Sequence, residues 1–471
     1  MAAASVLATL ALAATTLSGA AGVAGAVRPV KAAPVPTLFV KKASPYALSH
    51  GYVGLAFEAT TMKQPYLDPA QSNLPTFLDQ LGHGNLRFGG QSSELNAVWQ
   101  PTPAALPSWA NFAITPEDLS TVAGLANATG WSVDLGVNLL EYNPALAADE
   151  VKAARSELGA SLHAVEIGNE PDIYFLWSQS LTEPPQFIPL NFPDYQTEWN
   201  AYFAQITQAS PGAKIAGPDF FLNRWQSSYT AKMAKNLSVY TQHYYPLSDC
   251  NGTVLSPETL LSAHSLSTED TAVAVATQTA KKAKAPVVLD EFNSISCGSS
   301  SPAAWEFASA LWGVEALLEG ALHGVSSVNV QATPGDCTSY TPLCVPDPSE
   351  PATLVANPIF SAMQLVAGLE GGTMLKTGVK KVALPAGVNT YAVRLPDGDT
   401  AYVVDNTTPT DVTTLSLQGS GTSQLVSVQR LEAPSLDATT GVTLATSTPA
   451  TPGLTGLSVP AYSAAVFTVT P

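Results

Sequence analysis

Two glutamates occupy positions where a pair of carboxyl groups could do acid–base and nucleophilic chemistry. Glu170 ends the apolar segment AVEIGNE, and Glu291 lies near the end of PVVLDEF. A protonated carboxyl group can give a proton to a reacting oxygen while an ionised one attacks a carbon. A lone carboxylate at such a position is usually a cap or part of a loop ion pair. Two of them, after separate apolar segments, favour a catalytic pair.

Hydrolysis of a glycosidic bond is the reaction that such a pair fits. Its transition state resembles an oxocarbenium ion flanked by two carboxyl groups, one protonated and one ionised. In enzymes that retain the anomeric configuration these groups lie about 5–5.5 Å apart. Two like charges at that separation disfavour double ionisation, so one group keeps its proton. We expect the retaining separation between Glu170 and Glu291.

The elements that would carry this pair form an α/β pattern. From about Gly51 to Ala367, short apolar segments alternate with amphipathic helical stretches, which is typical of a parallel sheet covered by helices. The expected strands are residues 53–58, 85–90, 132–138, 164–170, 214–219, 238–245, 286–292 and 326–332. Eight strands predict a closed (β/α)8 TIM barrel, whose active site lies at the C-terminal ends of the strands. Glu170 would end the fourth strand and Glu291 the seventh.

A second domain follows from about Gly371. Short alternating runs flank Asp397-Gly398, a strong hairpin signal, and helical patterns disappear. We predict a C-terminal antiparallel β-sandwich, to which residues 37–41 add one strand. The predicted division is a signal peptide (1–27), an N-terminal segment that contributes to the β-sandwich (28–48), the catalytic barrel (49–368) and the β-sandwich (369–471).

Composition limits the class of partner. The chain has 20 basic and 37 acidic residues, and its formal net charge of −17 argues against nucleic acid, anionic membranes and long polyanions. Residues 6–17 are apolar, and small residues follow through Ala24-Gly25-Ala26, which predicts export and a secreted protein. No metal motif or cofactor signature is recognisable, so we expect no cofactor and no metal. The oligomeric state is left open.

Four cysteines in an exported chain predict two disulfides, for which three pairings exist. Cys337 and Cys344 are close neighbours in a Pro-rich loop, which leaves Cys250 with Cys297, each shortly after a predicted barrel strand. That pairing is favoured, and the other two stay open.

The motifs around the two glutamates resemble known glycoside hydrolases. GNEP on the fourth strand with a glutamate on the seventh is similar to clan A. Together with a C-terminal sandwich, VEIGNEPD and LDEFNSISCG most resemble glycoside hydrolase family 79, which contains exo-β-glucuronidases and heparanases. The resemblance covers essentially the whole mature chain. It implies that Glu170 is the general acid/base and Glu291 the nucleophile of a retaining exo-β-glucuronidase that removes terminal β-linked glucuronic acid, or its 4-O-methyl form, from glycans or small glucuronides.

The resemblance also implies roles around the reacting carbon. Asn169 would bond the 2-hydroxyl of the sugar, and Glu58 would bind distal hydroxyls. Arg87, in LRFGG, is the natural cation to keep the nucleophile ionised, although it could instead pin barrel strands together. Tyr245 would orient Glu291, with Tyr244 as the alternative because strand alternation turns one of them inward.

Recognition of the sugar carboxylate is expected from two loops. Gly298, after the seventh strand, matches a backbone N–H donor of the family, and Tyr340, after the eighth, matches a tyrosine donor. Ser296 stands where the family often has a second tyrosine. His243 is expected to be a packed, hydrogen-bonded residue.

Two other functions are compatible with the sequence. Another clan A retaining β-glycosidase acting on a neutral sugar (a xylosidase, glucosidase or arabinofuranosidase) would keep the same glutamates and differ in its recognition loops. A non-catalytic carbohydrate-binding barrel is the second, and retention of both carboxylates counts against it. Heparanase-type endo-cleavage is disfavoured because a groove for heparan needs basic residues, which this acidic chain has few of.

Overall fold

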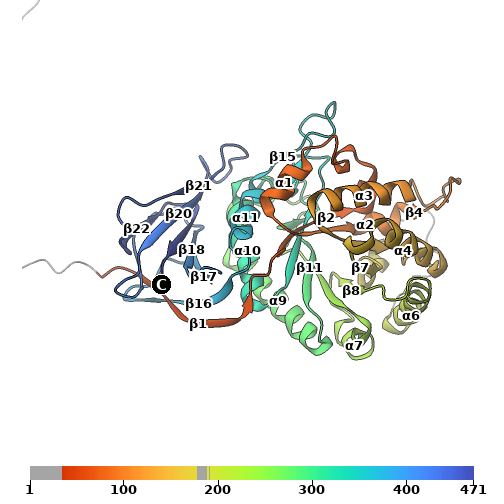
Figure 1. Cartoon of the computed structure of the whole chain (residues 1–471), viewed down its shortest axis with the longest axis horizontal. Coiled ribbons are helices and arrows are strands. Elements are labelled where there is room, and N and C mark those ends of the chain that lie inside the picture. The colour runs from red at the N-terminus through yellow and green to blue at the C-terminus, as the bar shows by residue number, and fades with distance from the viewer. Residues whose placement is uncertain (1–33, 178–187, 190) are drawn as a thin grey trace, which may run out of the picture. The chain divides into compact units, whose positions relative to one another are not determined.

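The computed structural model describes residues 34–177, 188–189 and 191–471. The predicted signal peptide and residues 28–33 lie outside the described residues. Residues 35–471 form one unit, which holds both the barrel and the antiparallel sheet described below (Figure 1).

Eight parallel strands close into a barrel in the order β11-β13-β2-β3-β6-β7-β8-β9. These strands are buried almost throughout, which explains their near-continuous apolar runs. All eight predicted strands are confirmed: β2 (Val53–Glu58), β3 (Asn85–Gly89), β6 (Ser132–Val137), β7 (Leu162–Ile167), β8 (Ile215–Phe220), β9 (Val239–Tyr244), β11 (Val287–Phe292) and β13 (Ser327–Ala332). Most boundaries differ from the prediction by one to three residues. The difference that affects the site is at β7, which ends at Ile167, so that Glu170 lies in the turn that follows.

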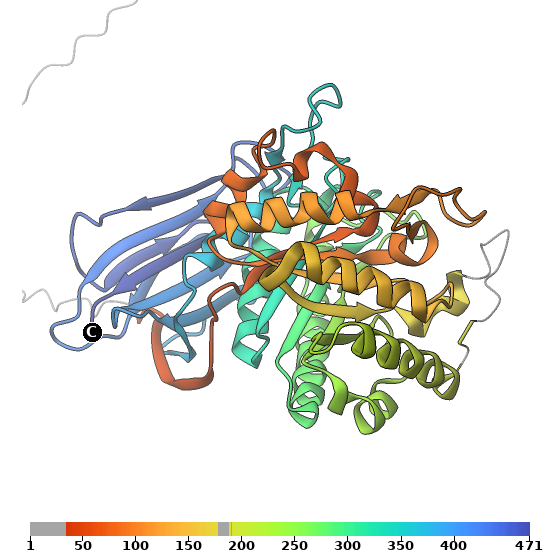
Figure 2. The ribbon, with the colours of Figure 1, turned by 45° about the vertical axis from the view of Figure 1, so that its right-hand side comes forward.

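Helices cover the outside of the barrel. In Figure 2, α3, α4 and α6 (orange, gold and olive) lie one after another outside the strands. Several helices begin at a proline, whose missing N–H is not needed in the first turn. The helices are α1 (Leu74–Leu81), α2 (Gly90–Leu95), α3 (Pro116–Thr129), α4 (Pro144–Leu158), α5 (Tyr174–Trp177), α6 (Phe192–Ala209), α7 (Gln226–Lys232), α8 (Pro257–Leu260), α9 (Ala263–Ala283), α10 (Phe307–His323) and α11 (Pro358–Ala367).

Short elements complete the loops at the barrel. They are the 3₁₀ helices η1 (Ala59–Lys63), η2 (Pro65–Leu67), η3 (Gly159–Ser161), η4 (Pro171–Ile173), η5 (Ala234–Asn236) and η6 (Pro302–Ala304), and the strands β4 (Ala97–Trp99), β5 (Phe112–Ile114), β10 (Leu247–Ser248), β12 (Ile295–Ser296), β14 (Leu343–Cys344) and β15 (Val355–Ala356). β10 and β12 pair in parallel, so the loops after β9 and β11 run side by side.

The second domain is the predicted β-sandwich. It is a nine-stranded sheet whose two halves pack face to face around one apolar core. Its order is β21-β20-β23-β18-β17-β16-β1-β19-β22. Residues from both halves of the sheet, including Leu38, Val404, Leu415 and Phe467, share one core. The bounds are β1 (Thr37–Ala47), β16 (Thr373–Lys380), β17 (Val388–Arg394), β18 (Thr400–Asn406), β19 (Val412–Leu417), β20 (Leu425–Glu432), β21 (Thr443–Ser447), β22 (Thr455–Val459) and β23 (Ser463–Val469).

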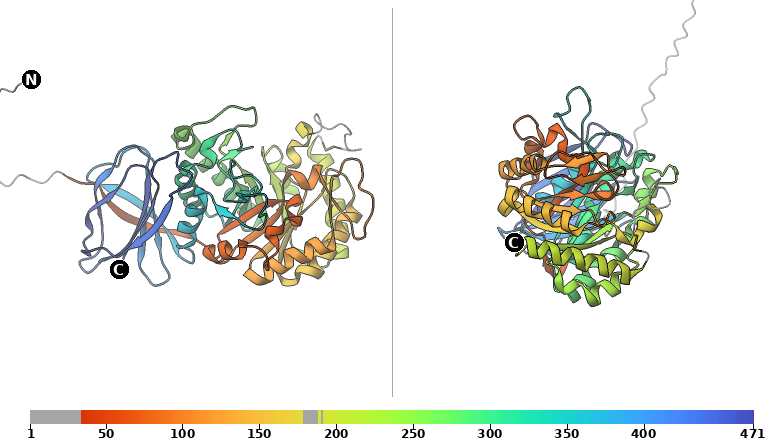
Figure 3. Two further views of the ribbon diagram at one scale, coloured as in Figure 1. Left: turned by 90° about the horizontal axis from the view of Figure 1, so that it is seen from above. Right: turned by 90° about the vertical axis from the view of Figure 1, so that its right-hand side faces the viewer.

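Strand β1 carries the N-terminal segment into this sheet, as predicted. It pairs antiparallel with β16 and, at Thr37 and Leu38, parallel with β19, so it joins the two halves. Figure 3 shows β1 in red among the blue C-terminal strands. The predicted hairpin is also present: β17 and β18 pair antiparallel, and Gly398 between them has a φ of 95°.

Helix α10 links the two domains and is buried along nearly its whole length. It packs against α9 and α11 of the barrel and against β1, β16 and β18 of the sheet. The backbone N–H groups of Phe307 and Ala308 donate to the carbonyls of Ala438 and Leu436. A helix that is apolar on every face is expected where both sides are covered.

Both favoured disulfides are present. Cys250–Cys297 joins the loops after β9 and β11, and Cys337–Cys344 closes a short loop after β13. In the described part of the chain, we find no helix with the length and apolar character needed to cross a membrane.

Candidate active site

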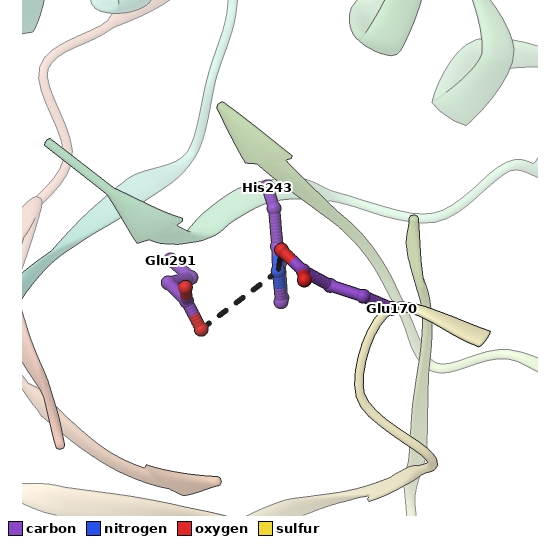
Figure 4. Close-up of side chains that lie close together, drawn as sticks. All are labelled: Glu170, His243 and Glu291. Atoms are coloured by element: carbon purple, nitrogen blue, oxygen red, sulfur yellow. Dashed lines mark hydrogen bonds and ion pairs between the residues drawn. The ribbon is translucent and has the colours of Figure 1, made fainter. Parts of the chain in front are cut away.

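Glu170 and Glu291 meet at the C-terminal end of the barrel (Figure 4). Each keeps 8% of its surface exposed, and a carboxylate oxygen of one lies within 4.8 Å of a carboxylate oxygen of the other. An approach this close is compatible with the roughly 5–5.5 Å separation expected for a retaining pair. The turn after β7 aims Glu170: its φ is 50°, and its N–H donates to the carbonyl of Asp219.

Arg87 on β3 lies beneath this pair and donates to three side chains. Its Nη1 is 2.7 Å from Glu291 Oε2, its Nε is 2.8 Å from Glu166 Oε2 and its Nη2 is 2.8 Å from Asn169 Oδ1. The guanidinium thus lies next to the carboxylate of Glu291, the position at which the sequence analysis expects a cation. Arg87 is fully buried and these three donors are directed at protein groups; a contact between Arg87 and the substrate stays a prediction.

His243 on β9 bridges the acidic groups. Its Nδ1 is 3.0 Å from Glu170 Oε1, and its Nε2 is 3.5 Å from Asp290 Oδ2. Burial alone would lower the pKa of His243, but the charges of Glu291 and Asp290 and the hydrogen bond to Glu170 raise it well above its usual value. His243 is thus packed and hydrogen-bonded, as expected, and it is held protonated against the catalytic pair.

The pKa of Glu170 is raised to about 7, mainly by burial. The hydrogen bond and charge of His243 oppose this rise, and the charge of Glu291 adds to it. Glu170 therefore holds a proton up to about neutral pH. Glu291 instead accepts hydrogen bonds from Arg87 and from the hydroxyl of Tyr245, 3.0 Å away. The two glutamates are in different environments, which is what an acid and a nucleophile require.

Two buried aspartates behind the pair were not found from the sequence. Asp290 precedes Glu291 on β11, and Asp219 lies at the end of β8. Burial and the charges of Glu166 and Asp290 raise the pKa of Asp219 well above its usual value. Asp290 has a lowered pKa, because His243 and Arg87 outweigh the effect of its burial. Asp219 is therefore the member of this pair that favours the protonated form, and Asp290 the one that favours the ionised form.

Glu94 on α2 is a further buried acid that sequence reasoning missed. Its carboxylate accepts from the backbone N–H groups of Asn169, Leu139 and Leu140, at 2.8, 3.0 and 2.8 Å. Burial raises its pKa to about 7. Glu94 thereby ties the loop after β6 to the turn that carries Glu170. Nothing in the segment GQSSEL distinguishes this glutamate from an exposed helical one.

Hydrogen bonds to two neighbouring side chains orient Asn169. Its backbone N–H donates to Glu94 and its Oδ1 accepts from Arg87. The amide group therefore turns its Nδ2 away from Arg87. The expected bond from Asn169 to the sugar 2-hydroxyl stays a prediction.

Three aromatic side chains line the loops after β9 and β13. Tyr245 donates to Glu291 Oε1, whereas Tyr244 lies against Phe292 with ring centroids 6.3 Å apart. Of the two tyrosines considered, the structure thus puts Tyr245 in contact with Glu291. The ring centroid of Tyr340 lies 6.0 Å from that of Tyr245, so the two tyrosine rings pack together beside Glu291.

Gly298 does not fit its predicted role. Its N–H was expected to receive the sugar carboxylate, but it donates to Asp249 Oδ1 at 2.8 Å. The other oxygen of Asp249 accepts from Ser300 N. Asp249 is separated from Gly298 by 49 residues, so no local pattern could indicate that this amide is already hydrogen-bonded.

The lack of a side chain at Gly298 leaves room for Tyr340. Gly298 has a φ of 59°, and a Cβ there would lie 2.0 Å from Tyr340 Cδ1. We predict that Gly298→Ala displaces the Tyr340 ring and raises KM at least threefold. Gly252→Ala is the matched control, since Gly252 has a φ of 79° but no atom within 4 Å of its Cβ position. Both variants carry the strain of a left-handed residue, about 1–2 kcal/mol, so an equal KM for the two would contradict the steric argument.

Glu58 ends β2, which lies between β13 and β3 in the barrel. Its Oε2 accepts from Ser92 N at 2.8 Å, and Gln331 Nε2 lies 3.4 Å from its Oε1. Burial, followed by the charge of Glu291, raises the pKa of Glu58. The charge of Glu291 thus acts on Glu58, and the expected contact of Glu58 with a distal hydroxyl stays a prediction.

Two sets of side chains bring possible metal ligands together. They are Glu170, His243 and Glu291, and Asp219, His243 and Asp290, each with ligand atoms within 4.8 Å of one another. Both sets depend on His243, whose Nδ1 is 3.0 Å from Glu170 Oε1.

Comparison with known proteins shows which solved structures have a similar fold. No protein-family model and no curated protein matches the sequence. A 4-O-α-L-rhamnosyl-β-D-glucuronidase from Fusarium oxysporum 12S matches with a TM-score of 0.72 and 18% identity over 92% of this chain and 100% of its own. A family 51 α-L-arabinofuranosidase from Bifidobacterium longum has a TM-score of 0.68 and 15% identity over 93% and 100%.

A third solved structure, the catalytic domain of GH30 xylanase C from Talaromyces cellulolyticus, has a TM-score of 0.57 and 15% identity over 92% and 100%. At these identities the likeness shows the fold, a (β/α)8 barrel with a β-sandwich. It does not single out family 79, and it leaves the activity to be argued from the site.

Proposed function

We propose that this protein is a retaining glycoside hydrolase in which Glu170 is the general acid/base and Glu291 the nucleophile. The observation that carries the proposal is the closeness of two buried carboxyl groups in contrasting environments. Burial keeps Glu170 protonated to about pH 7, while Arg87 and Tyr245 donate hydrogen bonds to Glu291. The glycoside hydrolases that share the fold support the same class.

The reaction proceeds in two steps. Glu170 gives its proton to the glycosidic oxygen as the bond from that oxygen to the anomeric carbon breaks, and Glu291 attacks the same carbon to form a glycosyl ester. Glu170, now ionised, takes a proton from water, whose oxygen displaces Glu291 from the anomeric carbon. One water is consumed, both carboxyl groups return to their starting states, and the anomeric configuration is retained.

We further propose that the sugar released is a terminal β-linked glucuronic acid. The family 79 resemblance of VEIGNEPD and LDEFNSISCG supports this substrate, as does the glucuronidase from Fusarium oxysporum that shares the fold. Tyr340 supplies a neutral phenol donor beside the site, which can bind a carboxylate without a basic pocket. Asn169 would bond the 2-hydroxyl through its Nδ2.

A neutral sugar is the second candidate. Ser296 replaces a tyrosine donor of the family and the Gly298 amide is engaged by Asp249, so two of the expected carboxylate contacts are missing. Arabinofuranosidases and a xylanase also share the fold.

A panel of nitrophenyl glycosides distinguishes these substrates. We expect kcat/KM on the β-glucuronide to exceed that on the β-glucoside, β-xyloside and α-arabinofuranoside at least 100-fold. NMR of the first product formed should show the retained anomer. Faster turnover of a neutral glycoside would move the assignment to that sugar, and an inverted product would reject the roles given to Glu170 and Glu291.

A further inference from the structure

Three consecutive backbone N–H groups anchor the turn that carries Asn169 and Glu170. Those of Gly168 and Glu170 donate to backbone carbonyls of β6 and β8, at 3.1 and 3.0 Å. The N–H between them, that of Asn169, donates instead to a side-chain oxygen, Glu94 Oε1, at 2.8 Å. Of these three anchors, only the middle one depends on the amino acid at the partner position. A substitution can therefore remove it while the barrel strands keep their pairing.

The carboxylate of Glu94 is itself held in place by the loop after β6. Its side chain is fully buried, and its second oxygen accepts from the N–H groups of Leu139 and Leu140, at 3.0 and 2.8 Å. The backbone carbonyl of Glu94 accepts from Asn138 Nδ2, at 3.0 Å, so the same loop also binds the end of α2. Helix α2 and this loop are thus joined to each other where the carboxylate reaches across to the turn after β7.

The amide group of Asn169 is fixed by a different partner. Its Oδ1 accepts from Arg87 Nη2 at 2.8 Å, which leaves the Nδ2 hydrogens as the donors that can reach a sugar hydroxyl. Glu94 therefore sets the backbone of Asn169, and Arg87 sets the rotation of its amide. Both contacts are needed to define where Nδ2 points.

We propose that Glu94 is a positioning residue: by holding the backbone of Asn169, its carboxylate sets the strength of the hydrogen bond from the Asn169 amide to the 2-hydroxyl of the bound sugar. The inference rests on the proposed function and deepens it, because it names the residue on which discrimination between sugars with and without this hydroxyl depends. A hydrogen bond to the 2-hydroxyl strengthens in the transition state. Displacement of the amide should therefore slow the reaction of sugars that carry this hydroxyl more than that of sugars that lack it.

Glu94→Gln removes this control with almost no change in side-chain volume. A carboxylate offers two acceptor oxygens, whereas an amide offers one oxygen and an NH₂ group that only donates. Two backbone N–H groups face one oxygen of Glu94, and the N–H of Asn169 faces the other. The Gln oxygen is expected to turn toward the two N–H groups, which places its NH₂ against the N–H of Asn169. Two donors that face each other repel, so the peptide of Asn169 should shift.

The test compares dinitrophenyl β-glucuronide with its 2-deoxy analogue. Dinitrophenol leaves without a proton, so the acid function of Glu170 does not enter the comparison. For each enzyme, the ratio of kcat/KM on the two substrates is independent of the fraction of protein that is folded. We expect this ratio, 2-hydroxyl over 2-deoxy, to fall at least tenfold from the wild type to Glu94→Gln. Asn169→Ala, which removes the amide itself, should lower the ratio at least as far.

Glu150→Gln is the matched control. Glu150 is a glutamate on α4 that is 5% exposed, and its Oε1 has no hydrogen-bond partner among the described residues. Loss of this carboxylate should leave the turn after β7 in place, so the ratio should stay within twofold of the wild type. Glu94→Asp keeps both oxygens but is one methylene shorter, so it should lower the ratio in the same direction. It takes the place of Glu94→Gln if that variant yields no folded protein.

The outcomes separate this inference from the proposed function. Equal losses on both substrates in Glu94→Gln would show that Glu94 only supports the fold, and would reject the inference while the glycosidase stands. An unchanged ratio in Asn169→Ala rejects the contact with the 2-hydroxyl and the inference with it. If the wild type hydrolyses no glucuronide, the substrate assignment fails. The same ratios on the best neutral glycoside and its 2-deoxy analogue then decide the role of Glu94.

Discussion

Glu291→Ala is expected to lower kcat/KM at least about 10⁴-fold, equivalent to about 5.4 kcal/mol of transition-state free energy. Without the carboxylate no glycosyl ester forms, and water has no activated route to the anomeric carbon. The truncated side chain also leaves space beside Arg87 and Tyr245, both of which contact Glu291 in the native site. Initial rates with nitrophenyl β-glucuronide measure the loss.

A small anion should partly restore this variant in a characteristic way. Azide can enter the space left in Glu291→Ala and attack the anomeric carbon from the face that Glu291 used, which gives an α-glycosyl azide. Glu291→Gln fills the same space, so it should lose the same activity and show no rescue. Glu157→Gln, an exposed change on α4 with the same loss of charge, should behave as wild type. Residual activity above one hundredth in Glu291→Ala would remove Glu291 from the nucleophile position.

The barrel and the sheet domain could be predicted because their signals are local. Each barrel strand is buried on both faces, so its apolar run stands out from the amphipathic helix that follows. The hairpin at Asp397-Gly398 depends on a glycine with a positive φ, which is a two-residue signal. The two glutamates were found for the same reason, since each closely follows a recognisable strand.

The inward placement of Asp290 and Asp219 could not be predicted, because it depends on shifts in the pairing register of β11 and β8. Simple alternation would turn Asp290 away from Glu291, but the register of β11 against β9 shifts between Val288 and Glu291. Both side chains then reach His243. The register of β8 against β9 shifts similarly before Phe220 and brings Asp219 inward. No residue in the segments 290–292 (DEF) and 217–220 (GPDF) indicates these register shifts in the sequence.

The engaged amide of Gly298 and the buried Glu94 were missed for a second reason. Each depends on a partner far along the chain: Asp249 for Gly298, and the loops after β6 and β7 for Glu94. Long-range pairing of a polar group leaves no trace in the local sequence. Recognition loops were therefore harder to predict than the catalytic pair, which explains why the class of reaction is better supported than the identity of the sugar.

Glu170→Ala should have an effect that depends on the leaving group. With a sugar or nitrophenol as leaving group, which needs a proton, kcat/KM is expected to fall about 10²–10⁴-fold, the usual contribution of a general acid. With dinitrophenol, which leaves without a proton, the first step should proceed and the glycosyl ester should accumulate. KM should then fall together with kcat, because the second step has lost its base. Turnover of the two aryl glycosides measures the difference.

The pH profile gives an independent readout of the same group. Glu170 must be protonated to act as an acid, and its pKa of about 7 means that activity is present below neutral pH and is lost as pH rises through about 7. Glu170→Ala should therefore lose this alkaline limb when kcat/KM is followed with a substrate whose leaving group needs a proton. Azide should rescue this variant from the face that water uses and give the β-glycosyl azide, opposite in configuration to the azide from Glu291→Ala. If the alkaline limb survives in Glu170→Ala, another group donates the proton, and His243, 3.0 Å from Glu170, is the residue to examine next.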